Sequence, residues 1–221
     1  MRGGHPWAYG DIVTRSANDT RDKLIAHGQR LFAEQGVFSV PLRLVVEQAG
    51  QKNSSALHYH FGGREGLVQA IIERHNEGIE VERAEMLRVL RDNGEADDIP
   101  ALVRALVLPF SRKLETSEGR EFLRIIAQLS ELFDAWAHES PYTPAQAQAA
   151  FVLLAAALDG LPENVRHERV TTFLLLMSES LALRARQMEL GRLLAVSTDA
   201  FVTNLIDMSI GALSAPCSSI G

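Results

Sequence analysis

The sequence is poor in cysteine and in long apolar runs. Its 221 residues include a single cysteine, Cys217, so a disulfide within the chain is excluded. The longest apolar run, residues 151–158, is too short to cross a bilayer, and residues 1–13 contain no apolar run of the kind that a signal peptide needs. We therefore expect a cytoplasmic protein that has no membrane partner.

Strand patterns and catalytic motifs are also lacking. No stretch alternates apolar and polar residues over the length of a strand, whereas apolar residues recur at helical spacing through most of the chain. The sequence contains no glycine-rich phosphate loop, no helical metal-binding motif and no recognisable pairing of a nucleophile with a base. We predict an all-α protein without a cofactor, and an enzyme is the weaker alternative.

The charge of the chain is unevenly distributed. The formal net charge is −6, yet residues 1–76 hold nine Lys/Arg against seven Asp/Glu, a formal +2. The remaining residues hold 13 Lys/Arg against 21 Asp/Glu, a formal −8. Because an acidic body repels phosphate while a basic end attracts it, this asymmetry is consistent with contact to DNA through the N-terminal third alone.

Start and stop signals predict a flexible tail and three helices in the first third of the chain. Residues 1–17 have no sustained periodicity and are expected to form the tail. Cap residues or proline precede each apolar run that follows, and glycine ends it. The predicted helices run from the caps Asn18, Asp19 and Thr20 to Gly36, from Pro41 to Gly50, and from a cap at Ser54 or Ser55 to Phe61.

Longer helices are predicted in the rest of the chain. A long amphipathic helix is expected from about residue 64 to 92, after the Gly62–Gly63 break. Thr143, Pro144 and Gln146 form the pattern of a capping box with proline at the first helical position. The later helices are expected at 99–116, 118–138, 143–159, 162–189 and 197–214.

The second and third predicted helices form a helix-turn-helix pattern. Two such short helices cannot bury their own apolar face, so they must pack on the first helix. Leu57 and Phe61 are four residues apart and share one side of the third helix, which leaves polar and aromatic residues on the other sides. Spacing alone leaves two alternatives open, a surface that binds DNA bases and phosphates or an ordinary hairpin with solvated polar residues.

Residues 20–72 resemble the DNA-binding domain of the TetR family of bacterial transcriptional repressors. The residues that carry the resemblance are Ala26, Leu31, Phe32, Gly36, Arg43, Val45, Glu47, Ala49, Gly50, Leu57, Tyr59, His60, Phe61, Arg64, Glu65 and Leu67. The resemblance implies an N-terminal three-helix helix-turn-helix domain, residues 18–68, followed by a C-terminal helical regulatory and dimerisation domain, residues 69–215. It also implies a double-stranded DNA operator as a partner.

The resemblance implies which residues contact DNA. Arg64 is expected to bind phosphate at the start of the long helix, where the helix dipole favours an anion. A metal site is not expected, because His58 and His60 are two apart on a helix and point about 200° apart. The implied DNA-binding residues are Arg43, Lys52, Asn53, Ser54, Ser55, Ala56, His58, Tyr59, His60 and Arg64.

The last two predicted helices carry broad apolar stripes. A core within the chain explains such stripes, and so does packing against a second copy, as in the four-helix dimers that the resemblance implies. We expect a homodimer whose interface includes Phe173, Met177, Leu181, Phe201, Leu205 and Met208.

The middle helices hold the residues expected to line a pocket for a small-molecule effector. These residues are Met86, Phe110, Phe122, Phe133, Trp136, His138 and Phe151, although each of these residue types is more often plain core than pocket lining. The resemblance therefore implies a homodimeric repressor that is released from a palindromic operator by the effector. A helical interaction protein or an activator with the same fold remains an alternative.

Overall fold

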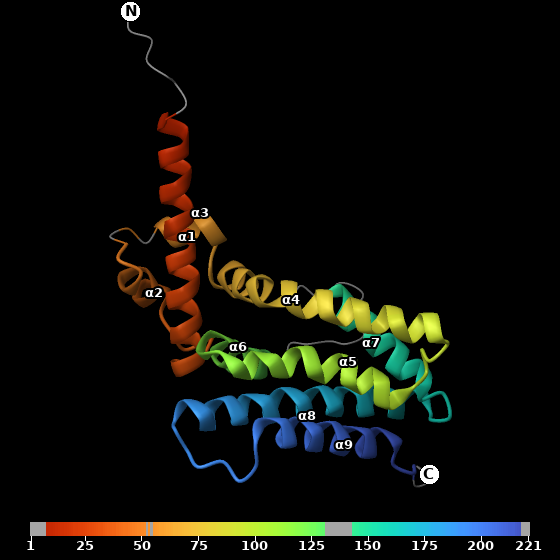
Figure 1. Ribbon diagram of the computed structural model, residues 1–221. Helices are drawn as coiled ribbons and strands as arrows, with labels where there is room; N and C mark the ends of the chain where they lie inside the picture. The colour runs from red at the N-terminus through yellow and green to blue at the C-terminus, as the bar shows by residue number, and fades with distance from the viewer. Residues whose placement is uncertain (1–7, 52, 54, 131–142, 218–221) are drawn as a thin grey trace, which may run out of the picture. The chain divides into compact units, whose positions relative to one another are not determined.

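The computed structural model describes residues 8–51, 53, 55–130 and 143–217, with side chains from residue 18 onward. All regular secondary structure in that part of the chain is helical (Figure 1). The chain divides into two compact units, residues 1–71 and residues 72–221. None of the helices in the described part is both long and apolar enough to cross a membrane.

The first unit contains α1 (Ala8–Gln35), α2 (Leu42–Gln48), α3 (Ser55–Phe61) and the first turns of α4 (Arg64–Asn93). The helix α1 begins at Ala8, so the predicted tail is wrong for residues 8–17, and the expected caps at residues 18–20 lie inside the helix. No proline follows residue 6 until Pro41, so nothing stops the helix from extending beyond its apolar part. Asp19 instead pairs with Lys23 at 2.6 Å, one turn later.

The turn between α2 and α3 is determined by Gly50. The N–H of Gly50 donates to the carbonyl of Glu47 at 3.1 Å, and the N–H of Gln51 donates to the carbonyl of Val46 at 3.0 Å. This pair of bonds is the Schellman arrangement, which needs a left-handed residue after the helix, and Gly50 has φ +71°. The helix α2 therefore ends where the sequence predicts.

A second glycine lets α3 and α4 approach closely. A Cβ atom at Gly66 would lie 1.9 Å from the carbonyl oxygen of Phe61, far inside van der Waals contact. On the other side of the same turn of α4, Leu67 is fully buried and packs against α1 at Gly28, where a Cβ would lie 2.9 Å from Leu67 Cδ2. Glycine at these two positions allows the three-helix unit to close.

The second unit contains the remainder of α4, α5 (Ile99–Ser111), a 3-10 turn η1 (Arg112–Glu115), α6 (Ser117–Leu129), α7 (Ala145–Ala157), α8 (Glu163–Glu189) and α9 (Thr198–Ser214). The helix α6 packs along α8, α5 packs along α9, and α8 and α9 lie side by side (Figure 1). Three helices begin at side-chain caps, in which Asp98, Thr116 and Ser197 accept backbone N–H groups at 3.0–3.2 Å.

The start of α7 corrects the predicted capping box. Pro144 is the N-cap and makes no side-chain hydrogen bond, while Thr143 Oγ1 is buried without a hydrogen-bond partner. The backbone N–H of Gln146 donates instead to Glu80 Oε2 at 2.7 Å. The cap therefore comes from α4, 66 positions earlier in the chain, which local pattern cannot reveal.

The stripes of α8 and α9 mainly form the core of the second unit. Four residues expected at a dimer interface, Phe173, Met177, Leu181 and Leu205, are at most 4% exposed and belong to one apolar cluster within the chain. This burial corrects the prediction for these four, because their side chains have no surface left for a second copy. Phe201 is half-buried beneath the guanidinium of Arg184, 5.1 Å away, and Met208 is exposed.

Candidate functional site

The helix α3 separates an apolar side from a polar side. Leu57 is buried, and Phe61 is half-buried with the guanidinium of Arg21 5.5 Å from its ring centroid. On the opposite side Ser55 and His58 are exposed, and Tyr59 exposes 84% of its surface. Tyr59 thus presents both its aromatic ring and its hydroxyl group to the solvent.

The first turn of α3 is held by Asn53. Its Oδ1 accepts the backbone N–H of Ser55 at 3.0 Å and also the hydroxyl hydrogen of Ser55. The cap is therefore Asn53 rather than Ser55, and the other predicted cap, Ser54, lies outside the described residues together with Lys52. The cap thereby orients the exposed Ser55 hydroxyl.

The two histidines of α3 have different surroundings. His58 is exposed, whereas His60 is half-buried, with its ring 5.1 Å from that of Tyr59 and 6.0 Å from that of Phe61. The half-buried Ala56 completes the set of predicted contact residues on this helix. Within the described part of the chain, no three His, Cys, Asp or Glu side chains come together in a way that could hold a metal ion.

Arg64 has partners that the sequence does not predict. Its Nη2 donates to the carbonyl of Val40 at 2.7 Å, and its Nη1 donates to the carbonyl of Val37. The guanidinium also lies 5.6 Å from the ring centroid of Phe32. Arg64 thus ties the start of α4 to the turn between α1 and α2, so it positions the helix-turn-helix elements in addition to any contact with phosphate.

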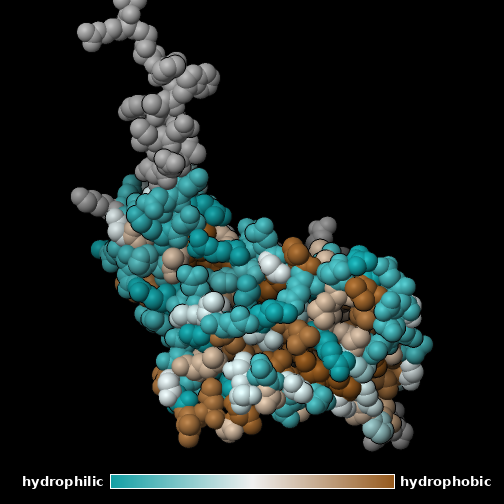
Figure 2. Space-filling view, in the orientation of Figure 1, coloured by the Kyte–Doolittle hydropathy of each residue, from teal (hydrophilic) through white to brown (hydrophobic). Residues whose placement is uncertain are grey.

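Of the two arginines among the predicted contacts, Arg43 is the more accessible. It exposes 85% of its side chain at the start of α2 and pairs with Glu47 at 2.6 Å on the same helix. An exposed pair of this kind contributes little stability and is easily exchanged for another anion. The face of the first unit seen in Figure 2 is largely hydrophilic, as a surface that meets DNA phosphates requires.

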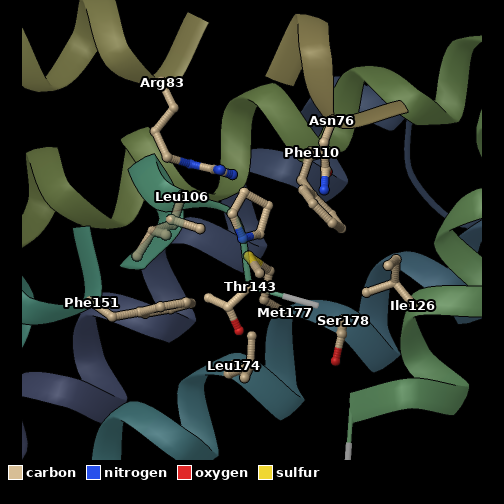
Figure 3. A pocket seen from close by; sticks show the side chains of 12 residues that line it. Asn76, Arg83, Leu106, Phe110, Ile126, Thr143, Phe151, Leu174, Met177 and Ser178 are labelled. Carbon is tan, nitrogen blue, oxygen red and sulfur yellow. The ribbon is translucent and has the colours of Figure 1, made fainter. Parts of the chain in front are cut away.

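The second unit contains a small cavity. It has a volume of about 40 Å³ and is lined by Asn76, Arg83, Leu106, Phe110, Ile126, Thr143, Pro144, Ala147, Phe151, Leu174, Met177 and Ser178 (Figure 3). Phe110 and Phe151 are predicted pocket residues that the structure brings together there. Phe122 is fully buried against Phe110, and Met86 is partly buried, but neither belongs to the lining. The predicted Phe133, Trp136 and His138 lie outside the described residues.

The sequence analysis missed the polar lining of this cavity. Arg83 is 2% exposed and stands between Ile79 and Leu87, each four residues away and also buried, on one side of α4. A charged residue within an otherwise apolar stripe is the signal that could have identified it. Asn76 lies seven residues earlier on the same helix and also lines the cavity. Met177 was assigned to the dimer interface but lines this cavity.

The charge of Arg83 is balanced inside the unit. Its Nη1 donates to Glu80 Oε1 at 2.5 Å, and its Nε donates to the carbonyl of Ala105 at 3.2 Å. Burial lowers the pKa of the Arg83 guanidinium, while the carboxylate of Glu80 raises it. Since an arginine pKa starts far above neutrality, Arg83 stays charged.

Comparison with known proteins gives a match to the N-terminal part of the chain. Residues 24–71 match the family described as bacterial regulatory proteins, tetR family. The HTH-type transcriptional regulator LmrA of Bacillus subtilis (strain 168) is 31% identical over 97 residues, which are 43% of this chain and 50% of LmrA. The chain thus matches half of the length of that relative.

Three solved structures resemble most of the chain at low identity. A TetR-family regulator from Streptomyces coelicolor A3 is 17% identical with a TM-score of 0.45, over 96% of this chain and 99% of its own. A gamma-butyrolactone receptor (ArpA-like protein) is 21% identical with a TM-score of 0.45, over 88% and 97%. RolR in complex with resorcinol is 18% identical with a TM-score of 0.39, over 94% and 100%.

Proposed function

We propose that this chain is a transcriptional regulator of the TetR family, a homodimeric repressor that a small-molecule effector releases from a palindromic operator, and the match of residues 24–71 to that family supports the proposal. The observation that carries the proposal is α3, a capped helix with Leu57 buried on one side and Ser55, His58 and Tyr59 exposed on the other. Since bacterial operators lie on the chromosome, this function places the protein in the cytoplasm.

In this proposal α3 enters the major groove and its exposed side chains contact base edges. Ser55 and His58 can exchange hydrogen bonds with bases, and Tyr59 offers both an apolar ring and a hydroxyl group. Arg43 contacts the phosphate backbone at the edge of the groove. Arg64 keeps the start of α4 joined to the turn that precedes α2, through the carbonyls of Val37 and Val40.

The proposed dimer uses the sides of α8 and α9 that the rest of the unit leaves uncovered. Leu175, Leu183 and Met208 are exposed apolar residues on these two helices. Figure 2 shows further apolar side chains at the end of the second unit where the α8–α9 connection lies, and Leu190, Leu193 and Val196 are exposed in that connection. The recognition helices of such a dimer would bind half-sites about 34–36 Å apart, one turn of the duplex.

Release from DNA requires the effector to prefer one form of the dimer. The effector must bind more tightly to a form whose recognition helices do not match the operator, and each ~1.4 kcal/mol of that preference weakens operator binding tenfold. We place the effector at the cavity around Arg83. The helix α4 carries Arg83 in the second unit and Arg64 in the first, so a ligand that moves Arg83 acts on the helix that positions the helix-turn-helix elements.

The test measures binding of the full chain to labelled DNA from upstream of its own gene by fluorescence anisotropy. We expect specific binding that survives excess unrelated DNA, and Tyr59→Ala should weaken it at least tenfold. Val152→Asp, a substitution at an exposed residue of α7, is the control and should leave affinity unchanged.

Equal affinity for upstream and unrelated DNA would favour the alternative of a helical interaction protein. Loss of transcription in the absence of the protein would favour an activator.

A further inference from the structure

Arg83 has unused hydrogen-bond donors that face the cavity. Its Nε and Nη1 atoms donate to Ala105 and Glu80, and within the described part of the chain no acceptor is bonded to Nη2. Figure 3 shows the guanidinium extending from α4 toward the centre of the cavity. A buried guanidinium with an unused N–H side favours an acceptor that arrives with a ligand.

The surroundings of Arg83 favour an anion over a neutral acceptor. Among the described residues that line the cavity, Arg83 is the only charged one. Its counter-charge, Glu80, is shared, because Oε1 accepts from Arg83 and Oε2 accepts from the N–H of Gln146 at the N-terminus of α7. The N-terminus of α7 adds partial positive charge beside the same carboxylate. The single negative charge of Glu80 is therefore no larger than the positive charge of Arg83 and the helix N-terminus together.

A second donor lies in the same cavity. Thr143 Oγ1 is buried and has no hydrogen-bond partner, which costs free energy unless a ligand or a water supplies one. The walls between these polar groups are apolar and include Leu106, Phe151 and Met177. The cavity therefore combines a cation and a hydroxyl with a surface suited to a short hydrocarbon chain.

The size of the cavity limits the ligand. A volume of about 40 Å³ leaves room for roughly three water-sized groups, at about 10–15 Å³ each. A volume this small favours a carboxylate with a short chain over one with a long chain.

We propose that this cavity binds a short aliphatic monocarboxylate, whose carboxylate accepts hydrogen bonds from Arg83 and Thr143 and whose chain packs on the apolar walls. The inference rests on the proposed effector function, of which it names the ligand class. A carboxylate on Arg83 competes with Glu80 for the same guanidinium. Since Glu80 also caps α7, occupation of the site shifts the contact between α4 and α7.

The test titrates the DNA-free full-length protein with sodium acetate, propionate, butyrate and hexanoate by isothermal titration calorimetry, at constant ionic strength maintained with NaCl. Acetamide, propionamide and butyramide are the neutral counterparts. We expect propionate or butyrate to bind at least tenfold more tightly than its amide, and hexanoate to bind more weakly than butyrate. Amides that bind as well as the acids, or no binding by any of the acids, would overturn the proposal.

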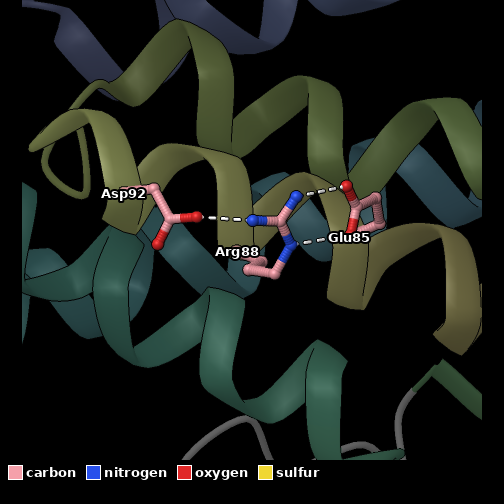
Figure 4. A network of polar contacts seen from close by, with 3 residues as sticks. All are labelled: Glu85, Arg88 and Asp92. Carbon is pink, nitrogen blue, oxygen red and sulfur yellow. Dashed lines mark hydrogen bonds and ion pairs between the residues drawn. The ribbon is translucent and has the colours of Figure 1, made fainter.

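A substitution at Arg83 and a matched control test whether Arg83 binds the carboxylate. Arg83→Lys retains the charge but loses the planar fork, and should weaken butyrate binding at least tenfold. The matched control is Arg88→Lys on the same helix, because Arg88 also bonds acidic neighbours, Glu85 and Asp92, but is exposed (Figure 4). It should leave binding unchanged. If both lysine variants weaken binding equally, the effect is not specific to Arg83 and the site assignment is wrong.

Thr143→Val keeps the inference testable if Arg83→Lys does not fold. It removes a buried hydroxyl that lacks a partner, so the free protein should be at least as stable while butyrate binding weakens severalfold. Unchanged butyrate affinity in Thr143→Val would show that Thr143 is not part of the site.

The same titration on operator-bound protein separates the proposed effector role from the proposed carboxylate site. Butyrate that binds without releasing DNA contradicts the effector role and leaves this site standing, whereas DNA binding without carboxylate binding contradicts only this inference.

Discussion

The imidazole of His75 stacks on the ring of Phe122, with the ring centroids 4.5 Å apart and the planes 16° from parallel. Both residues are buried in the second unit, His75 on α4 and Phe122 on α6. Burial, together with the smaller effects of the charges of Lys113 and Arg74, lowers the pKa of His75 from 6.5 to about 4. The neutral imidazole is therefore the form that fits between these helices.

This stacking predicts loss of stability in mild acid. Between pH 6.5 and about 4 the unfolded chain binds a proton at His75 that the folded chain does not, so the free energy of unfolding falls as pH falls through this window. At ~1.4 kcal/mol per pKa unit the full effect is about 3 kcal/mol. Urea unfolding at a series of pH values measures it. His75→Phe should flatten the slope in this window, whereas replacing the exposed His58 by Gln should not. An equal slope in His75→Phe would assign the effect to other groups.

The close approach at Gly66 predicts a sharp difference between two glycines of α4. Gly66→Ala places a Cβ 1.9 Å from the Phe61 carbonyl oxygen and should destabilise the first unit by about 3 kcal/mol, the upper end of the usual cost of overpacking. Gly78→Ala is the control, because nothing lies within 4 Å of its Cβ and alanine favours a helix by about 1 kcal/mol. Denaturant unfolding followed by circular dichroism compares the two. If Gly66→Ala is as stable as the natural chain, α3 and α4 do not meet as described.

The salt dependence of operator binding distinguishes a residue that contacts phosphate, as proposed for Arg43, from a residue that positions the helices, as Arg64 does. Arg43 is exposed, so Arg43→Ala should lower the slope of log affinity against log salt by about 0.9, the value for one phosphate contact. Arg64 donates to the carbonyls of Val37 and Val40, so Arg64→Ala should lower affinity at every salt concentration, leave the slope unchanged and reduce the melting temperature. A slope lower by about one with an unchanged melting temperature would instead support the phosphate contact that the sequence predicts for Arg64.

The exposed apolar residues of α8 and α9 predict where charge disrupts the proposed dimer. Leu183 on α8 is 57% exposed, so Leu183→Asp should fold normally yet shift the protein from dimer to monomer in light scattering at micromolar concentration. Met208→Asp on α9 should act in the same way. The control is Val152→Asp on α7, at a residue as exposed as Met208, both being 53% exposed. A natural chain that is monomeric, or a Leu183→Asp variant that stays dimeric, would contradict this interface.

The ends of several helices could be predicted because the signals that set them are local. Pro41 and Gly50 bracket α2, the Gly62–Gly63 pair separates α3 from α4, and the predicted spans of α8 and α9 each differ from the observed ones by one residue at the N-terminus. Backbone conformation and cap preference operate within a turn of the chain, so the amino-acid order alone carries them. The start of α1 could not be predicted, because a polar segment without proline can either extend a helix or remain unstructured.

The sequence by itself determined the helical class of this protein and the helix-turn-helix with its exposed polar side, since apolar periodicity and turn residues specify both. Only the tertiary structure decided which apolar residues of α8 face their own core, that Arg83 is buried beside a cavity, and that Glu80 caps α7 in place of Thr143. Each of these depends on groups tens of residues apart. A buried charge or an apolar stripe is compatible with several partners, and only packing in three dimensions selects one of them.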